Sequence, residues 1–269
     1  MIENSTFIVP LRIESTDRLR NVIVSSCYIL DNTDAKIIIQ EVDTASTFGA
    51  TALPQIRECV GDKADRLKHV FEDSKDPIFH RTRILNDMTM MSDTPVVVNY
   101  DCDILLPLES YQQAEEKILD GTYDVVYPYG DGDWQYQVFA DDELVSKFIN
   151  EDYNLTELKK KSRVYDAKYG FCQFFNREKY IDGGLENEHF IAYGYEDNER
   201  WYRFNTMGYN VGRLDAHVYH LEHARTANSW FSNPYIDKNK NLYERINQMN
   251  REELKEYYSN LDYVKVRTR

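Results

Sequence analysis

The chain lacks paired cysteines, long apolar runs and internal repeats, and each absence excludes a class of protein. Its four cysteines are widely spaced with no Cys-x-x-Cys pair, which argues against a disulfide framework and a zinc ribbon. No stretch approaches the roughly 18–20 consecutive apolar residues of a membrane span, and the N-terminus lacks the regions of a secretory signal. We therefore expect a cytoplasmic protein without a transmembrane segment, and leave peripheral membrane association and oligomeric state open.

Basic residues are in the minority. With 32 Lys and Arg against 46 Asp and Glu, the formal net charge is −14. This charge argues against a nucleic-acid binder, which needs a basic face to displace counterions, and against general adsorption to anionic lipid. It does not exclude an anionic nucleotide, because a bound cation and a few arginines can override the overall field locally.

The order of hydrophobic patterns indicates an α/β fold. Residues 6–9 and 36–40 are β-branched, apolar runs, and helical spacing over residues 15–30 separates them. This β-α-β order is typical of a parallel sheet, and 269 residues suffice for one large α/β domain or two modest ones.

Further elements are predicted along the rest of the chain. We expect strands at residues 67–71, 95–100, 123–127, 171–175, 210–213 and 216–220, and helices at 79–91, 108–119, 196–207 and within 237–260. Residues 44–53 are expected to form a loop near the ligand and 128–134 a turn-rich stretch. Residues 141–161 show little that resembles core and predict a surface excursion or lid.

Two carboxylates interrupt the most apolar stretch. The strand at 95–100 stops at Asp101 and Asp103, and the apolar run 104–106 follows directly. Carboxylates are costly to bury unpaired, so the pair is expected where the strand leaves the sheet, the edge at which open α/β sheets bind ligands. Their oxygens suit Mg²⁺ or Mn²⁺, which shares its other positions with phosphates. The alternative is an ordinary strand exit with solvated acids.

Glycines, aromatic residues and acids are concentrated in residues 183–203. Gly183 and Gly184 allow close approach of a ligand, Tyr195 offers a flat face for a sugar ring, and the acids Glu196 and Asp197 open a helix. A carboxylate fixed there can take a proton from a hydroxyl; the alternative is that both acids only stabilise the helix start. Glu199 and Arg203, four residues apart, are assigned a structural role.

Three of the six histidines fall within seven positions, at His217, His220 and His223. Imidazole is a good Mn²⁺ ligand, and with Asp103 it would complete a half-shell that leaves room for a diphosphate. A histidine at such a position can equally be an ordinary polar residue. Trp134, within the turn-rich stretch, is a candidate stacking platform for an acceptor sugar or else a partly buried loop anchor.

Taken in order, these patterns resemble a known family. The order is Pro-x-Arg at 10–12, an Arg- and Asn-bearing helix at 81–86, Asp-x-Asp at 101–103, Gly-Gly-x-Glu…Gly-Tyr-Glu-Asp-x-Glu at 183–199 and His-x-x-His at 220–223. This set resembles the GT-A-fold glycosyltransferases and is similar to the group of β-1,4-galactosyltransferases, chondroitin polymerase domains and polypeptide N-acetylgalactosaminyltransferases. Residues 192–195 lack the tryptophans of the galactosyltransferase motif, which leaves the donor sugar open.

The resemblance implies a fold and its division. It implies a single GT-A, Rossmann-like domain over residues 1–225, with a mostly parallel sheet flanked by helices. The nucleotide-binding half would span about 1–107 and the acceptor-binding half about 108–225. Residues 226–269 would form a helical C-terminal extension packed on this domain.

The resemblance also implies roles for individual residues. Asp103 would bind Mn²⁺ (or Mg²⁺), with Asp101 on the ribose or a metal-bound water and His220 (preferred) or His223 as a further ligand. Asp197 would be the general base of an inverting reaction, with Glu196 beside it contacting a sugar. The nucleotide pocket would include four further residues: Pro10, Arg12, Asp43 and Arg83.

The resulting hypothesis is a metal-dependent inverting glycosyltransferase. It would move a sugar from a nucleoside diphosphate sugar, expected to be UDP-hexose or UDP-N-acetylhexosamine, to a hydroxyl of a glycan or lipid-linked glycan in polysaccharide biosynthesis. Two alternatives stay open: a non-catalytic nucleotide-sugar-binding or assembly subunit, and a sugar nucleotidylyltransferase. The latter ordinarily shows a glycine-rich basic loop after the first strand, which residues 10–14 do not resemble.

Overall fold

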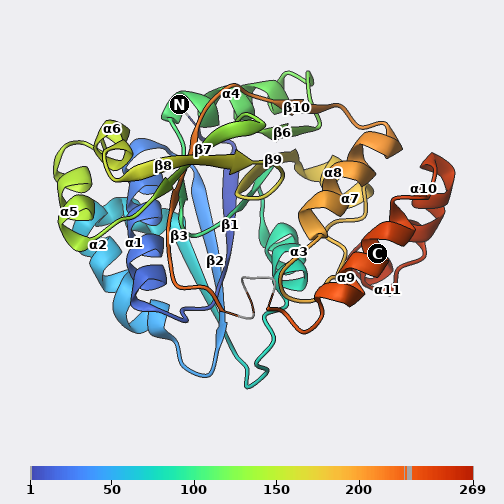
Figure 1. Cartoon of the computed structure of the whole chain (residues 1–269), viewed down its shortest axis with the longest axis horizontal. Helices are drawn as coiled ribbons and strands as arrows, with labels where there is room; N and C mark the ends of the chain where they lie inside the picture. The colour runs from blue at the N-terminus through green and yellow to red at the C-terminus, as the bar shows by residue number, and fades with distance from the viewer. Residues whose placement is uncertain (1, 227, 229–231, 269) are drawn as a thin grey trace.

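A seven-stranded sheet runs through the centre of the molecule (Figure 1). The structure is a computed structural model that describes residues 2–226, 228 and 232–268. In the order β10-β6-β9-β4-β1-β2-β3, the strands are Val211–Arg213, Val125–Tyr127, Cys172–Asn176, Val96–Tyr100, Ser5–Leu11, Lys36–Asp43 and Leu67–Asp73.

Parallel pairing brings the carboxyl ends of the central strands to one edge of this sheet. β1 pairs in parallel with both β4 and β2, and β2 with β3. Only β9 runs against its neighbours β4 and β6 among the described strands of this sheet. All residues of β1 and β4 are buried, which explains their continuous apolar, β-branched sequences. Asp101 and Asp103 follow directly at the carboxyl end of β4.

Helices cover both faces of the sheet. Phe7 and Val9 of β1 point into a core that helices α1 and α4 complete, whereas Ile8, between them, packs with helix α3 on the other face. Ser15 begins α1 by accepting a hydrogen bond from the Arg18 backbone amide. The helices of this part are α1 Thr16–Asn32, α2 Leu53–Val60, α3 Arg81–Met91, α4 Leu108–Leu119, α7 Arg177–Asp182 and α8 Glu196–Met207, with a π-helix at Phe48–Ala52 and a 3₁₀ helix at Gly61–Arg66.

A second, four-stranded sheet, of which β7 and β8 are labelled in Figure 1, crosses in front of the first in that view. In the order β5-β11-β7-β8 its strands are Ile104–Leu105, Val218–Leu221, Gly132–Val138 and Ser162–Ala167. β11 lies between β5 and β7 and pairs with both. Because β5 follows Asp103, this pairing brings β11 close to the end of β4. The sequence did not predict this sheet: residues 128–134 were expected to be turns, yet β7 begins at Gly132.

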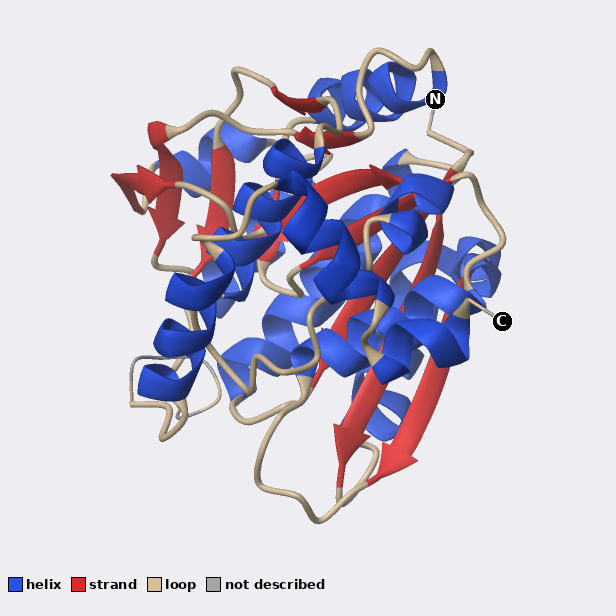
Figure 2. Ribbon diagram, turned by 90° about the vertical axis from the view of Figure 1, so that its right-hand side faces the viewer, coloured by secondary structure: helices blue, strands red, loops and turns tan. Residues whose placement is uncertain are grey.

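Three helices end the chain and pack against α8 (Figure 2). They are α9 Ile236–Ile246, α10 Arg251–Ser259 and α11 Asp262–Arg267. Their apolar side chains Ile246, Leu254 and Tyr258 form a core with Phe190 and Met207. This packing is of the kind expected for a C-terminal helical extension. The boundary between residues 225 and 226 stays a prediction.

The helix pair Glu199 and Arg203 has a structural role, although it is not on the surface. Both side chains are at most 1% exposed, their Oε1 and Nε atoms are 2.7 Å apart, and Tyr258 donates to Glu199 at 2.6 Å. The pair therefore fastens α10 to α8.

Most predicted elements are confirmed, and besides that of residues 128–134 two further expectations are wrong. Residues 44–53 are not simply a loop, because a π-helix forms at Phe48–Ala52 with Phe48 fully buried. Residues 141–161 lie largely at the surface, but the expectation that they contribute little core is wrong, because they form helices α5 Asp142–Asn150 and α6 Leu155–Lys159 with buried apolar side chains. Phe148 of α5 is fully buried against Tyr28 of α1. Within the described residues, no helix has the length and apolar character needed to span a bilayer.

Candidate functional site

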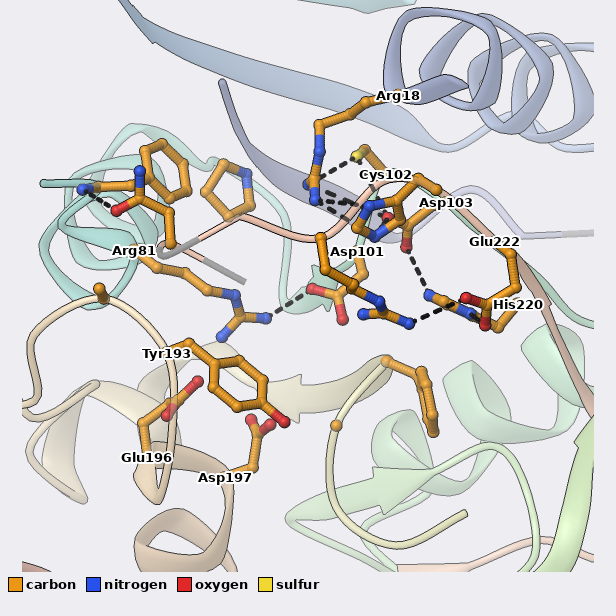
Figure 3. Close-up of a pocket in the computed structure, with 18 of the residues that line it drawn as sticks. Arg18, Arg81, Asp101, Cys102, Asp103, Tyr193, Glu196, Asp197, His220 and Glu222 are labelled. Carbon is orange, nitrogen blue, oxygen red and sulfur yellow. Dashed lines mark hydrogen bonds and ion pairs between the residues drawn. The ribbon is translucent and has the colours of Figure 1, made fainter. Parts of the chain in front are cut away.

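A cleft of about 690 Å³ opens where the carboxyl ends of β1 and β4 meet the second sheet. Asp103 and His220 lie on one side of it, and Glu196 and Asp197 lie on the other (Figure 3). The cleft therefore brings together three sequence segments that lie far apart in the chain: the end of β4, the start of α8 and the end of β11.

Asp103, His220 and His223 form a buried group whose ligand atoms lie within 4.8 Å of one another. Nε2 of His223 is 3.1 Å from Oδ2 of Asp103, and Nε2 of His220 is 3.7 Å from Oδ1. His220 bonds through Nδ1 to Glu222 Oε1 at 2.8 Å, which leaves Nε2 directed at Asp103 and is typical of a metal-ligating histidine. One carboxylate and two imidazoles fit Mn²⁺ and leave positions for a diphosphate. Both histidines, rather than His220 alone, can act as ligands.

The surroundings of Asp103 favour its ionised form. Burial alone would raise its pKa, but the hydrogen bond from His223 and the charges of His220, His223 and Arg18 hold the pKa of Asp103 well below the usual range. Arg18 of α1 lies 4.0 Å from this carboxylate and contacts the His223 ring at 3.2 Å. Arg18 was not among the predicted site residues, because its position on α1 carried no signal beyond helical spacing.

Asp101 lies at the mouth of the same cleft but outside this group of three. Its carboxylate, 32% exposed, accepts a hydrogen bond from Nη2 of Arg81 at 2.8 Å. Nη1 of Arg81 is buried without a hydrogen-bond partner among the described residues. Arg83, which the sequence analysis preferred, points elsewhere and pairs with Glu72 and Asp87. Residues two apart on a helix face different directions, so the cleft can receive only one of the two arginines.

Glu196 and Asp197 begin α8 and face the cleft from opposite Asp103 (Figure 3). Glu196 is buried and accepts a bond from the Gly194 amide at 2.7 Å; burial and the charge of Asp197 raise its pKa to about 7. Asp197 is 28% exposed. Burial raises the pKa of Asp197 as well, against the opposing charges of Arg200 and Arg81. The pKa shifts favour a proton acceptor at this position.

Arg200 connects Asp197 to the protein interior. It is fully buried and bonds to both carboxylate oxygens of Glu186, at 2.6 and 2.9 Å, and to Gln173 at 3.0 Å. Its Nη2 also lies 2.9 Å from Oδ1 of Asp197, as an ion pair without hydrogen-bond geometry. Tyr180 donates to Glu186 at 2.6 Å, so the carboxylate that binds Arg200 is itself fixed by a buried hydrogen bond.

Pro10 and Arg12, which were expected in a nucleotide pocket, line the cleft at the end of β1. Arg12 donates to the carbonyl oxygens of Val42 and Pro77 at 2.8 and 3.0 Å, while its Nη2 is buried with no hydrogen-bond partner in the described part of the chain. Asp43 does not line the cleft; it accepts a bond from the Thr44 amide at 2.7 Å. Its nucleotide role has no geometric support.

None of the four predicted acceptor-binding residues lines the cleft. Trp134 packs on the His217 ring at 4.7 Å, and Tyr195 stacks on Tyr243 at 5.8 Å. An added Cβ at Gly183 would clash with Phe204, and one at Gly184 with Tyr258, so these glycines permit close helix packing. Four other residues line the cleft instead, Tyr169, Gly170, Phe171 and Tyr193.

Comparison with known proteins identifies the fold. No protein-family model and no curated protein sequence matches the chain. Among solved structures, the chain is similar to a Pyrobaculum calidifontis mannosyltransferase in complex with GDP-Man and Mn²⁺, with 17% identity and a TM-score of 0.52 over 84% of this chain and 58% of that one. It is also similar to GalNAc-T7 with UDP, GalNAc and Mn²⁺, with 12% identity and a TM-score of 0.59 over 96% and 50%.

A third similar structure is S. aureus TarS residues 1–349, with 11% identity and a TM-score of 0.50 over 82% of this chain and 60% of that one. The chain thus spans only half to three fifths of these solved chains. The likeness confirms the predicted fold: an α/β domain with a mostly parallel central sheet, similar to GT-A glycosyltransferases.

Proposed function

We propose that this protein is a metal-dependent, inverting glycosyltransferase that uses a nucleoside diphosphate sugar. The observation that carries the proposal is the pairing, across one cleft, of a group of three possible metal ligands with the carboxylates of Glu196 and Asp197. Two similar solved structures were obtained with Mn²⁺ and a nucleotide or nucleotide sugar, which supports the same ligands here.

Each group of the site has a place in this reaction. A metal ion held by Asp103, His220 and His223 would offset the negative charge that develops on the departing diphosphate. Arg81 has a free Nη1 with which to donate a hydrogen bond to the donor. Asp197 takes the proton of the acceptor hydroxyl. At the same time the hydroxyl oxygen of the acceptor bonds to C1 of the sugar, and the bond from C1 to the diphosphate breaks. This single displacement inverts the configuration at C1.

The proposal also names the donor and the acceptor. We propose UDP-hexose or UDP-N-acetylhexosamine as donor and a glycan or lipid-linked glycan in polysaccharide biosynthesis as acceptor, in the cytoplasm. The resemblance of the ordered motifs supports the donor class, and four free cysteines are consistent with a reducing compartment.

The direct test incubates the full chain with a panel of UDP- and GDP-sugars, with and without Mn²⁺. The expected result is slow, Mn²⁺-dependent hydrolysis of one donor and thermal stabilisation by the same donor. Tight, Mn²⁺-dependent nucleotide binding without hydrolysis or transfer would instead favour the non-catalytic binding subunit. Release of pyrophosphate from a nucleoside triphosphate and a sugar phosphate would favour the nucleotidylyltransferase.

A further inference from the structure

Three side chains on or directly beside the paired antiparallel strands β7 and β8 form a surface that the proposed reaction does not use. Phe139 and Tyr165 are 50% and 52% exposed, which is unusual for large aromatic residues in this chain. The guanidinium of Arg163 lies between them, 5.4 Å from the Phe139 ring centroid and 5.9 Å from that of Tyr165. We call Phe139, Arg163 and Tyr165 the hairpin strip.

The hairpin strip is continuous with the metal side of the cleft. Strand register places His220 of β11, Gln137 of β7 and Arg163 of β8 in one row across the second sheet. Residues in such a row share a face of the sheet, and Arg163 donates through Nε to Gln137 at 2.6 Å. Gln137 and Tyr165 also line the cleft. The strip therefore adjoins the cleft and shares Tyr165 with its lining.

The strip also leads to the proposed base. β8 ends at Ala167, and residues 168–171 continue along the cleft wall. At Gly170 an added Cβ would lie 3.2 Å from Oδ2 of Asp197. A molecule seated on Tyr165 could thus extend along this segment to Asp197 without crossing the metal site.

Charge on the strip favours an anionic occupant. Arg163 has no carboxylate within ion-pair distance in the part of the chain that the structure describes, and its polar partner is the Gln137 amide. Exposed aromatic rings suit the flat faces of sugars, and the guanidinium suits carboxylate or phosphate groups.

We propose that the hairpin strip binds the portion of an extended, anionic glycan acceptor that lies beyond the sugar receiving the transfer. This inference rests on the proposed function and names its acceptor class: a glycan of several units that carries carboxylates or phosphates. β8 is also an edge strand, and such strands can pair with a second copy of the chain. Self-association is therefore the competing outcome of the test.

The test measures glycan binding to the full chain by titration calorimetry in the presence of Mn²⁺ and UDP. The probes are a hyaluronan hexasaccharide (carboxylates), pentamannose phosphate (a phosphate) and uncharged maltohexaose. At least one anionic probe should bind more tightly than maltohexaose, and this binding should weaken with added NaCl. Arg163→Gln should weaken it about tenfold, the effect of one charged hydrogen bond. A hyaluronan disaccharide should bind more weakly than the hexasaccharide if carboxylates are the group recognised.

The matched control is Arg245→Gln, because Arg245 also lies over a tyrosine, Tyr257, at 5.7 Å but on the C-terminal helices. It should leave glycan binding unchanged. Equal binding of charged and uncharged probes, an equal loss in both variants, or no binding of any probe would overturn the proposal. So would a dimer, seen by sedimentation, that Arg163→Gln dissociates.

This readout separates the two proposals. Arg163-dependent glycan binding in a protein that hydrolyses no nucleotide sugar would support the strip and count against the transferase. Donor hydrolysis, together with glycan affinity that is the same in the wild type and in Arg163→Gln, would support the transferase and overturn the proposed role of the hairpin strip.

Discussion

The Nη2 atom of Arg200 lies 2.9 Å from Oδ1 of Asp197, while the remainder of the Arg200 guanidinium is held by Glu186 and Gln173. Both Arg200 and Glu186 are essentially inaccessible to solvent. The orientation of the proposed base is therefore set by its contact with an arginine that a buried ion pair holds in place. Arg200 is a positioning residue, since it acts on the reaction only through Asp197.

Arg200→Lys should impair catalysis without impairing donor binding. A lysine keeps the charge but cannot form a bidentate bond with Glu186 and also reach Asp197. We expect up to about a 10²-fold lower kcat from misplacement of the base, with the UDP–Mn²⁺ dissociation constant unchanged. Because the Arg200 charge lowers the pKa of Asp197, weakening their contact should also move the acidic limb of the pH–rate profile to higher pH. An unshifted profile would mean that Arg200 has only a structural role.

The base itself is tested by Asp197→Asn. General-base assistance is worth about 10²–10⁴-fold, so kcat for transfer should fall by that factor while donor affinity is retained. The raised pKa of Asp197 also predicts that wild-type activity falls, as pH decreases, at a pH above the ordinary value of 3.8. Full activity in Asp197→Asn would assign the base elsewhere, with Glu196 as the next candidate.

How much of this site could be predicted depended on whether the relevant signal was local. Asp103 follows an apolar strand and His220 ends one, so each carried a local sign of a sheet edge. Arg200 had no such sign, because its partner Glu186 is fourteen residues away and its burial results from tertiary packing. Arg83 rather than Arg81 was named for a similar reason: helical spacing showed that they face different directions, but not which direction leads to the cleft.

The metal site predicts a dependence on both histidines. With saturating UDP, Mn²⁺ should stabilise the wild type, by about 2.7 kcal/mol at a hundredfold excess over the dissociation constant, and chelation with EDTA should remove this gain. Asp103→Asn, His220→Gln and His223→Gln should each reduce the stabilisation, as measured by thermal unfolding. His80→Gln is the control, because His80 pairs with Asp76 on the surface. If His223→Gln behaves like that control, only His220 and Asp103 bind the metal.

Acid should destabilise the protein through Glu186. Although burial opposes ionisation, the charge and hydrogen bonds of Arg200 lower the pKa of Glu186 to about 2, from an ordinary 4.5. A carboxylate with a depressed folded-state pKa stabilises the fold above its ordinary pKa, and this contribution is lost as the pH falls from 4.5 towards 2. Glu186→Gln should therefore be less stable at pH 7 and show a weaker loss between pH 5 and 3, measured by urea unfolding. An identical pH slope in both proteins would contradict the assignment.

The corrected assignment of residues 141–161 makes a prediction about stability. Phe148 of α5 is fully buried, with its ring 6.1 Å from Tyr28 and 5.4 Å from Tyr153. If this segment were a lid, truncating Phe148 would alter substrate access and leave global stability unchanged. Because it is core, Phe148→Ala should cost about 3–5 kcal/mol in the free energy of unfolding, as measured by urea denaturation. Phe71→Ala, at a side chain 40% exposed on β3, is the matched control and should cost much less, since little of its surface leaves water on folding.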